Sequence, residues 1–379
     1  MNFKKINLDK VLKYTQPTKH IVQSTEYGDK FKTPVLTAGK NFLLGYTNEK
    51  EGIYKDIPAI IFDDFTTSFH YVDFPFKVKS SALKILNVRS NQVDIKYVYY
   101  QMKGVKIDTQ LHKRYWISRF SKKQIPLPPL ETQKQIAQTL DNAAALRDKT
   151  QQLLTEYDQL AESIFLDMFG DPVTNPNGWE ENKMSSICCK VTDGTHDTPE
   201  RLKEGIKFIT GKHIRPYKIE YENSDYVTEN THNEIFKRCN PEKNDVLYTN
   251  IGVNLGTAAL NSVEYEFSMK NVALLKPNDD LIKGRYLEFF LNNINMKKKI
   301  LWIASIGGAQ KFLSLNQLRK LKVLVPPIHL QNQFVEKIAL IEQQKDLAKQ
   351  ELQESEDLFQ ALLQKAFHPS EKHDESELV

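Results

Sequence analysis

The sequence predicts a mixed α/β fold of the α+β class, with two similar domains joined by two long antiparallel coiled-coil helices. Two observations lead to this prediction. A helical segment of 40 residues occurs twice, and the chain before each copy carries the same order of short strand-like runs, turns and one helix. The repeat therefore covers a whole half of the chain and gives the fold an internal pseudo-two-fold symmetry.

The two helical segments begin at paired prolines, residues 128–129 and 326–327, and align without a gap at an offset of 198 residues. Proline lacks the backbone N–H and is tolerated at a helix start, and neither copy contains Gly or Pro inside. Apolar or small residues recur at alternating steps of four and three, except at the aligned positions Arg147 and Lys345. This spacing predicts a coiled-coil seam with one polar layer. The alternative is that each helix packs on its own globular domain.

These helices divide the chain into six segments. They are block A (1–129), a long helix (130–169), a linker rich in Gly, Pro and Asn (170–177), block B (178–327), a second long helix (328–367) and a polar, acidic tail (368–379). Blocks of 129 and 150 residues are large enough to bury a core each.

Both blocks alternate strand-like runs with turns. In block A we predict strands within residues 33–38, 41–47, 58–65 and 69–78, followed by a helix at 94–102. In block B the corresponding segments are the strand and turn at 207–214, the strands at 244–252 and 270–276, and the helix at 286–291.

Charge is distributed unevenly along the chain. The net charge is +11 in block A and +4 in block B, against −5 in residues 130–177 and −6 in residues 328–379. Basic domains beside acidic helices favour a polyanion as partner of the blocks, with a merely lysine-rich surface as the alternative. No apolar run approaches membrane-spanning length and the first residues lack a signal-peptide core, so we expect a cytoplasmic protein without a membrane partner.

Several segments resemble catalytic or metal-binding motifs, but each departs from its motif at a position that the chemistry requires. Residues 205–213 resemble a phosphate-binding loop, but five residues separate the glycines in place of four, and His213 replaces the hydroxyl residue that holds magnesium. Both double prolines follow an aliphatic residue, unlike the Asn/Asp-Pro-Pro-aromatic loop that grips a flipped base. The three cysteines, Cys188, Cys189 and Cys239, lack zinc-ligand spacing and are expected to be reduced thiols.

Two acidic clusters remain as candidate metal sites. Asp63 and Asp64 at a strand end could hold magnesium in a nuclease, although no lysine stands two residues on and a turn is the favoured interpretation. His196 with Asp193 and Asp197 could form a metal cluster. We interpret the segment DGTHDTP (193–199) instead as a polar loop that donates to phosphates and base edges, with a simple turn as the alternative.

Several motifs together resemble the specificity subunits of Type I restriction–modification systems. They are the helix segments LPPLETQKQIA…FGDP and VPPIHLQNQFVEKI…AFHP and the block motifs TPVLTAGKNFLLGYT, IIFDDFTTSF, DGTHDTP and GGAQKFLSLNQLRKLKVLVPP. The resemblance covers nearly the whole chain. It implies that the blocks are target-recognition domains, each reading one half of a bipartite site in double-stranded DNA. It also implies that the helices set the spacing between them.

The same resemblance implies which partners and cofactors to expect. The helices would dock two methyltransferase subunits and, where the system includes them, two restriction or motor subunits. This chain would have no catalytic activity and would bind no metal or cofactor itself. S-adenosylmethionine would belong to the adenine-specific methyltransferase partner, and ATP with magnesium to the motor subunit. The alternatives are a DNA endonuclease that uses Asp63 and Asp64 and a coiled-coil bridging protein that does not bind DNA.

Candidate DNA contacts are the loop residues that combine bases, amides and hydroxyls, the groups that read phosphates and base edges. In block A they are Lys40, Asn41, Tyr46, Thr47, Gln110, His112, Lys113 and Arg114; in block B they are Asp193, Gly194, Thr195, His196, Lys212, His213, Arg215, Gln310 and Lys311. Gly194 is expected to allow close approach of the backbone to DNA. For each, a solvated surface side chain is the alternative. The candidate subunit-docking residues on the helices are Arg147, Lys345, Glu156 and Glu354.

Overall fold

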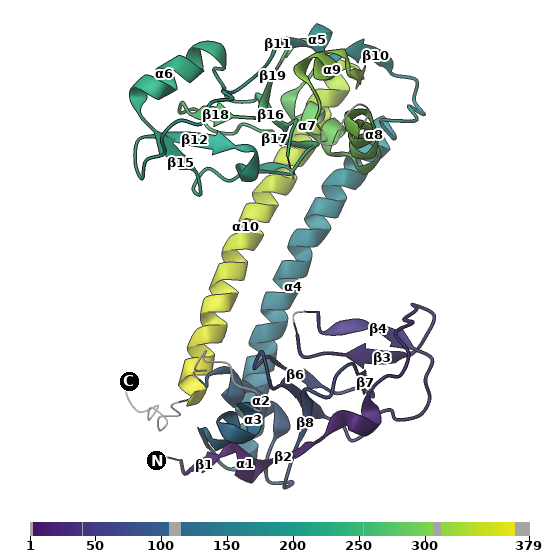
Figure 1. Cartoon of the computed structure of the whole chain (residues 1–379), viewed down its shortest axis with the longest axis vertical. Helices are drawn as coiled ribbons and strands as arrows, with labels where there is room; N and C mark the ends of the chain where they lie inside the picture. Colours follow the sequence, from purple (N-terminus) through teal and green to yellow (C-terminus); the bar gives the residue numbers. More distant parts are fainter. Residues whose placement is uncertain (1–2, 40, 106–114, 253, 306–311, 368–379) are drawn as a thin grey trace, which may run out of the picture. The chain divides into compact units, whose positions relative to one another are not determined.

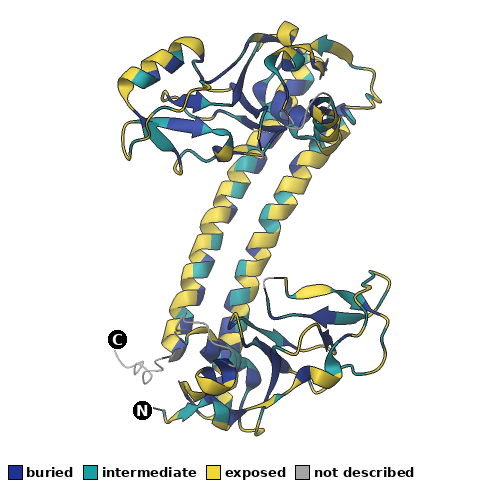
Figure 2. Ribbon diagram, in the orientation of Figure 1, coloured by how far each residue is buried: buried dark blue, intermediate teal, exposed yellow. Residues whose placement is uncertain are grey.

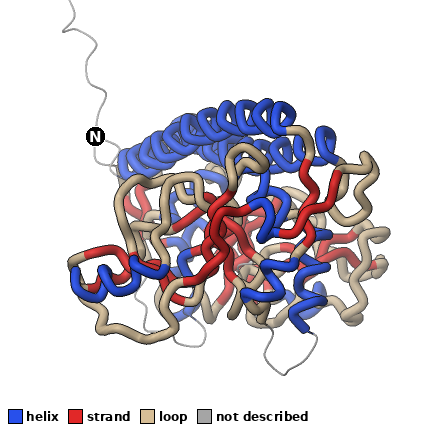
Figure 3. Tube along the Cα trace, turned by 90° about the horizontal axis from the view of Figure 1, so that it is seen from above, coloured by secondary structure: helices blue, strands red, loops and turns tan. Residues whose placement is uncertain are grey.

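The structure, a computed structural model, describes residues 3–39, 41–105, 115–252, 254–305 and 312–367. The chain forms two compact units: unit 1 contains residues 1–151 and 349–379, and unit 2 contains residues 152–348. Each unit combines strands with helices (Figures 1 and 3). This confirms the predicted mixed α/β class. Among the described residues, none of the helices has both the length and the apolar composition needed to cross a membrane.

Two helices of 40 residues, α4 (Leu130–Phe169) and α10 (Ile328–Phe367), occupy the predicted repeat. The boundary between the units cuts both of them. Unit 1 holds the start of α4 and the end of α10, and unit 2 holds the end of α4 and the start of α10. Figure 2 shows exposed stripes along both helices, interrupted by buried positions at regular intervals, as expected for amphipathic helices.

In unit 1 the two helix segments run antiparallel. Leu140 of α4 packs in one cluster with Phe359 and Ala366 of α10. Further along α4, Arg147 donates to Glu356 at 3.4 Å. A later residue of α4 therefore contacts an earlier residue of α10, as in antiparallel helices. This is the predicted seam, with Arg147 in a polar layer; the expectation of one polar layer is corrected, because Lys345 forms a second layer with Asp158 in unit 2.

In unit 2 the same pairing recurs with the helices exchanged. Phe165 and Phe169 of α4 pack edge-on against Phe334 of α10, with ring centroids 5.7 and 5.4 Å apart. Lys345 forms an ion pair with Asp158. The helix starts also join the cores of their own blocks, through Ala137 in unit 1 and Phe334 in unit 2. The two predicted alternatives, packing on the other helix and packing on a block, therefore both occur.

The described part of block A contains three sheets. The four-stranded sheet has the order β2 (Leu12–Thr15), β8 (Leu83–Val88), β5 (Ala59–Asp63), β6 (Phe69–Val72); the three-stranded sheet has the order β4 (Leu43–Thr47), β3 (Thr33–Leu36), β7 (Lys77–Val78); and β1 (Lys5–Asn7) pairs with β9 (Gln124–Pro126). The helices of block A are α1 (Leu8–Val11), α2 (Ile95–Lys103) and α3 (Tyr115–Ser118), with short 3-10 turns η1 (Pro17–His20) and η2 (Phe120–Lys122). The predicted strand at 69–78 is two strands, since Pro75 lies in the interruption and has no N–H for a ladder.

Block B repeats this topology. Its four-stranded sheet has the order β11 (Cys188–Asp193), β19 (Ala273–Pro277), β16 (Val246–Thr249), β17 (Thr257–Leu260); its three-stranded sheet has the order β15 (Asp225–Val227), β12 (Ile206–Thr210), β18 (Ser268–Lys270); and β10 (Glu180–Lys183) pairs with β20 (Lys322–Val325). Its helices are α5 (Met184–Ile187), α6 (Glu229–Arg238), α7 (Gly284–Asn292), α8 (Ile294–Ser305) and α9 (Leu315–Lys320), with the turn η3 (Gly211–His213) and the hairpin of β13 (Ile214–Arg215) and β14 (Lys218–Ile219).

One parallel strand pair marks the correspondence between the blocks. β3 pairs in parallel with β7, and β12 pairs in parallel with β18, while the other strand pairs of both blocks among the described residues are antiparallel. Because parallel strands end at the same edge of a sheet, each block gathers two loops from distant parts of its sequence at one edge.

A buried glutamine fixes the start of α4 to block A. Gln133 is 1% exposed, and its Oε1 accepts a hydrogen bond from the Asp94 N–H at 2.9 Å. Its Nε2 donates to the carbonyl oxygens of Gln92 at 3.2 Å and Pro128 at 2.8 Å. The side chain thus caps the backbone ahead of α2 from within the long helix.

The aligned glutamine performs the same task in unit 2. Gln331 is fully buried; its Oε1 accepts from the Lys283 N–H at 2.8 Å, and its Nε2 donates to the carbonyls of Leu281 at 3.1 Å and Pro326 at 2.8 Å. In each unit a helix start, the loop ahead of a block helix and a double proline are locked together by one side chain. The alignment of Gln133 with Gln331 in the sequence gives no hint that both are buried.

Candidate nucleic-acid interface

An open groove of about 600 Å³ lies in unit 2, at the edge of the sheet where β12 and β18 both end. Its lining includes four cations, Arg201, Lys212, Arg215 and Lys270, and two amides, Asn254 and Asn271. No Asp or Glu belongs to the described lining. A concave surface lined by cations and amides has the composition of a site for a polyanion with hydrogen-bonding edges.

Part of this positive charge is balanced by carboxylates that pair with the cations without lining the groove. Arg201 and Lys212 share Asp225, the lysine Nζ at 3.3 Å from the carboxylate. Burial alone would raise the pKa of Asp225, but these two cations hold it below its ordinary value. Arg215 pairs with Glu220 at 3.3 Å, and the ammonium group of Lys270 donates to the Thr198 hydroxyl. Four cations against two carboxylates leave a net positive charge at the groove.

The loop after β11 forms one rim of the groove because Gly194 lets it lie against β18. A Cβ at Gly194 would be 2.0 Å from the carbonyl oxygen of Met269, a distance no side chain tolerates. The Thr195 N–H donates to that carbonyl at 3.0 Å, and the Asn271 N–H donates to the Thr195 carbonyl at 3.2 Å. The glycine thus serves the packing of the protein's own backbone, and approach of this loop to DNA stays a prediction.

A chain of polar contacts crosses this rim. The Nδ1 atom of His196 lies 2.9 Å from Oδ1 of Asn271, and its Nε2 lies 3.1 Å from Oδ2 of Asp193. The other carboxylate oxygen of Asp193 accepts from Arg238. The carboxylate of Asp193 is 5% exposed, whereas the ring of His196 is 62% exposed. The carboxylate in the middle of this chain is therefore covered, while the ring of His196 at one end and Arg238 at the other, 52% exposed, are accessible from outside.

The predicted contact residues of block B divide by burial. Lys212, Arg215 and His196 are exposed, Thr195 is half-buried, and the first two line the groove. Three others are buried: Asp193, Gly194 and His213. Gln310 and Lys311 lie outside the described residues.

His213 shows why a polar residue of a turn can face inward. It is 2% exposed, and its Nδ1 accepts a hydrogen bond from the Thr210 N–H at 2.9 Å, capping the turn η3. Burial lowers its pKa, and the neighbouring Lys212 adds to this effect. The burial of His213, and the engagement of Asp193 by Arg238 and His196, correct the prediction that these side chains are available to DNA.

In block A the described candidates are Asn41, Tyr46 and Thr47. Asn41 is exposed, and Tyr46 lines a shallow hollow of about 520 Å³ together with Lys32 and Lys55. Thr47 is 1% exposed and its hydroxyl accepts from the Glu49 N–H at 3.3 Å, which corrects its assignment as a contact. The remaining candidates, Lys40, Gln110, His112, Lys113 and Arg114, lie outside the described residues.

The acidic pair at the end of β5 is structural. Asp64 is 4% exposed, forms an ion pair with Lys84 at 3.0 Å and accepts from the Trp116 N–H at 2.9 Å. Asp63 accepts from the N–H groups of Phe65 at 2.7 Å and Thr66 at 2.9 Å, closing a turn. Within the described ranges, no three His, Cys, Asp or Glu side chains are grouped as metal ligands would be. Both carboxylates are thus committed to the fold, which removes the residue basis for the endonuclease alternative.

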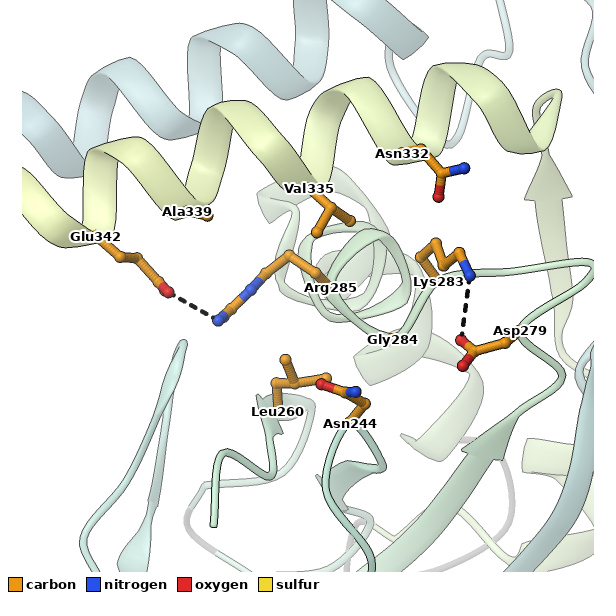
Figure 4. A pocket seen from close by; sticks show the side chains of 10 residues that line it. All are labelled: Asn244, Leu260, Asp279, Lys283, Gly284, Arg285, Asn332, Val335, Ala339 and Glu342. Carbon is orange, nitrogen blue, oxygen red and sulfur yellow. Dashed lines mark hydrogen bonds and ion pairs between the residues drawn. The ribbon is translucent and has the colours of Figure 1, made fainter. Parts of the chain in front are cut away.

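A second pocket of unit 2, of about 380 Å³, is a joint between α7 and α10 (Figure 4). Arg285 of α7 donates to Glu342 of α10 at 2.9 Å and to the fully buried Glu288 at 2.6 Å. Burial raises the pKa of Glu288, and Arg285 opposes this effect. Figure 4 also shows Lys283 directed at Asp279. The charges lining this pocket are paired with one another, so it joins two helices and offers little to a charged ligand.

The predicted docking residues lie where the helix pattern places them. Arg147 and Lys345 occupy equivalent polar layers, and their partners Glu356 and Asp158 are also separated by the repeat offset of 198 residues. Glu156 and Glu354 are exposed. Subunit docking by these residues stays a prediction.

Of the four cations and two amides of the groove, sequence reasoning missed four: Arg201, Asn254, Lys270 and Asn271. Lys270-Asn271 and Gly211-Lys212 each end a strand, which is the available signal. Only the parallel pairing of β12 with β18 brings the two loops together, and no local pattern encodes that pairing.

Comparison with known proteins agrees with this arrangement. Residues 2–156 and 176–356 match the family model of the Type I restriction modification DNA specificity domain. The EcoR124I/EcoR124II specificity subunit of Escherichia coli is 46% identical over 151 residues, 37% of this chain and 37% of that protein. The EcoBI specificity subunit of Escherichia coli is 23% identical over 276 residues, 64% of this chain and 57% of that protein. The chain thus spans less than two thirds of these relatives.

Solved structures share the fold along nearly the whole chain. The S subunit of a Type I restriction–modification system from M. genitalium superposes with a TM-score of 0.62 at 19% identity, covering 98% of this chain and 97% of that one. A chain from a study of complex assembly in the type I R-M system gives a TM-score of 0.55 at 15% identity, covering 97% of each chain. Since the family model matches both halves of the sequence, the chain belongs to the family of Type I restriction modification DNA specificity proteins.

Proposed function

We propose that this chain is the sequence-reading subunit of a Type I restriction–modification complex, in which each block reads one half of a bipartite site in double-stranded DNA. The observation that supports this most strongly is the repetition of one topology, with the same three kinds of sheet and the same parallel strand pair in both blocks. Two equivalent readers in one chain suit a target with two separate halves.

The groove of block B provides a physical basis for reading. Its four cations attract the phosphate backbone, which supplies affinity without sequence information. Asn271 lines the same groove and carries an amide, the group that pairs with adenine edges in the major groove. The amide nitrogen of Asn254, which also lines the groove, instead donates to the carbonyls of Gly211 and Ile214. Affinity and specificity thus come from different side chains at one place.

The long helices are proposed to set the spacing between half-sites and to dock the partner subunits. Each runs for 40 residues without interruption. Exposed leucines at aligned positions, Leu160 and Leu358, are 46% and 48% exposed beside acidic residues such as Glu156 and Glu354. Such mixed faces suit protein partners, here two methyltransferase subunits and, where present, two restriction or motor subunits.

In this assignment the chemistry lies outside the chain. The methyltransferase partner would bind S-adenosylmethionine and modify adenine, and the motor subunit would use ATP and magnesium. This chain would hold the DNA in register for them. The commitment of Asp63 and Asp64 to the fold supports this division of labour. We place the assembled complex in the cytoplasm, where its DNA substrate is.

The proposal is tested by DNA binding of the chain assembled with its methyltransferase partner. The logarithm of affinity for a specific duplex should fall linearly with the logarithm of salt, by about 0.9 per phosphate contact. Lys212→Ala should weaken binding and reduce the slope by about 1. Lys218→Ala is the matched control, because Lys218 is exposed on β14 and does not line the groove. Affinity that is independent of salt, or equal loss in both variants, would contradict the assignment.

A further inference from the structure

We propose that Asn271 reads one A·T base pair of the half-site recognised by block B, and that His196, held by Asp193, is the positioning residue for its amide. The inference rests on the proposed function, because it assigns roles within the DNA groove. It assigns one specific reader and one specific base pair to the groove.

The backbone of Asn271 is fixed at the groove. The residue follows directly on Lys270, lines the groove and has a φ of 52°, a left-handed conformation that asparagine tolerates better than most residues. Its N–H donates to the Thr195 carbonyl at 3.2 Å. The chain therefore turns at a defined point between β18 and β19, and the side chain starts from a fixed position.

The amide of Asn271 is also held. The carboxylate of Asp193 is an acceptor only, so the Nε2 atom of His196, 3.1 Å away, carries a proton and donates to it. This fixes the ring, whose Nδ1 lies 2.9 Å from the amide. The amide atom that faces Nδ1 is Oδ1, so a ring charged at both nitrogens donates to it, whereas a neutral ring accepts an N–H once the amide is turned by 180°. In both cases the contact holds the amide and leaves it at least one free oxygen lone pair and one free N–H.

That remaining pair of groups matches adenine. In the major groove adenine presents the N6 amino group as donor and N7 as acceptor side by side, and an asparagine amide pairs with both. A freely rotating amide would satisfy several bases, whereas a held amide discriminates because it does not reorganise on binding. Lys270, the neighbour of Asn271, carries a single point charge and is suited to phosphate, so it should add affinity without base preference.

The test is a competition binding experiment with the assembled methyltransferase complex. The competitors are duplexes in which each base pair of the block B half-site is replaced in turn. Asn271→Gly removes the amide without backbone strain, because glycine adopts positive φ freely. It should reduce discrimination at one A·T position by about 5- to 150-fold and leave the other positions unchanged. Equal melting temperatures of the variant and the wild type check folding.

Two further variants separate reading from positioning and from charge. His196→Ala should reduce discrimination at the same position by a smaller factor, because the amide is present but free to rotate. Lys270→Ala should weaken binding to all competitors alike. Asn271→Asp, which accepts hydrogen bonds but cannot donate to N7, should move the preference at that position toward C·G, whose cytosine offers a donor.

The outcomes are distinguishable. If the wild type discriminates but Asn271→Gly leaves every position unchanged, the assignment of Asn271 is wrong while the proposed function stands. If His196→Ala affects a different position from Asn271→Gly, then His196 reads a base itself and does not act through the amide. If the wild-type complex does not discriminate between duplexes, the proposed function fails as well.

Discussion

Replacing Gln331 with methionine should destabilise unit 2 by about 3 kcal/mol. The buried Gln331 side chain makes three hydrogen bonds to backbone groups, at 2.8, 3.1 and 2.8 Å. Methionine fills a similar volume but leaves the Lys283 N–H and two carbonyl oxygens without that partner. Each hydrogen bond contributes about 1 kcal/mol, and an unsatisfied buried group costs about 1–3 kcal/mol. For a unit of roughly 200 residues this loss corresponds to about 6–12 °C in melting temperature.

Hydrogen–deuterium exchange resolved to peptides measures this effect for each unit separately. The free energy of opening of the amides in β16 and β19 should fall by about 3 kcal/mol in Gln331→Met, while that of β5 and β8 stays unchanged. Gln133→Met should give the mirror result, because Gln133 makes the same three contacts in unit 1.

The matched control is Gln333→Met, an exposed position of the same helix, which should change stability by less than about 0.5 kcal/mol. If Gln331→Met and Gln333→Met behave alike, the buried glutamine does not lock the helix to the block. Equal loss in both units would show instead that they unfold together.

Three other predictions follow from the described contacts. Asp64→Ala leaves the Lys84 ammonium group buried without its carboxylate, so urea unfolding should show a loss of about 3–5 kcal/mol in unit 1; a loss below about 1 kcal/mol would mean that the pair is solvated. Burial depresses the pKa of His213, so the unfolded chain takes up the proton first as pH falls below about 6.5, and the stability of unit 2 should decline there. His213→Gln should reduce this pH dependence of melting, and an unchanged profile would exclude His213 as its source. Deleting residues 150–153 shortens α4 by about 6 Å and should shorten the DNA spacer by one or two base pairs at about 3.4 Å each; active enzyme with an unchanged spacer would show that helix length does not set spacing.

The long helices were predictable because every signal for them is local. The paired prolines define the starts, the absence of Gly and Pro permits 40 uninterrupted residues, and the aligned exceptions Arg147 and Lys345 mark the polar layers. The helix α2 was equally local, since Asp94 accepts a hydrogen bond from the Tyr97 N–H as its N-cap. Strands such as β5 and β16 followed from apolar runs between turns, whereas the short strands β2 and β17 were not predicted.

The groove was only partly predictable because its residues come from loops that meet through tertiary pairing. Lys212 and Arg215 were found from their local composition. The inward direction of His213, one residue after Lys212, depends on the cap it makes to Thr210. Gly194 was correctly identified as a site of close approach, but the approaching backbone is that of Met269, 75 residues away in the sequence.

The central claim is that each block reads its own half of the DNA target, and methylation mapping after a block exchange tests it most directly. Block B (178–327) is replaced by the corresponding block of a relative with a different target, and methylated adenines are mapped across the genome of cells that carry the exchanged chain. The account predicts that one half of the methylated site changes, while the other half remains that of block A. A change in both halves, or in neither, would contradict independent reading by the two blocks.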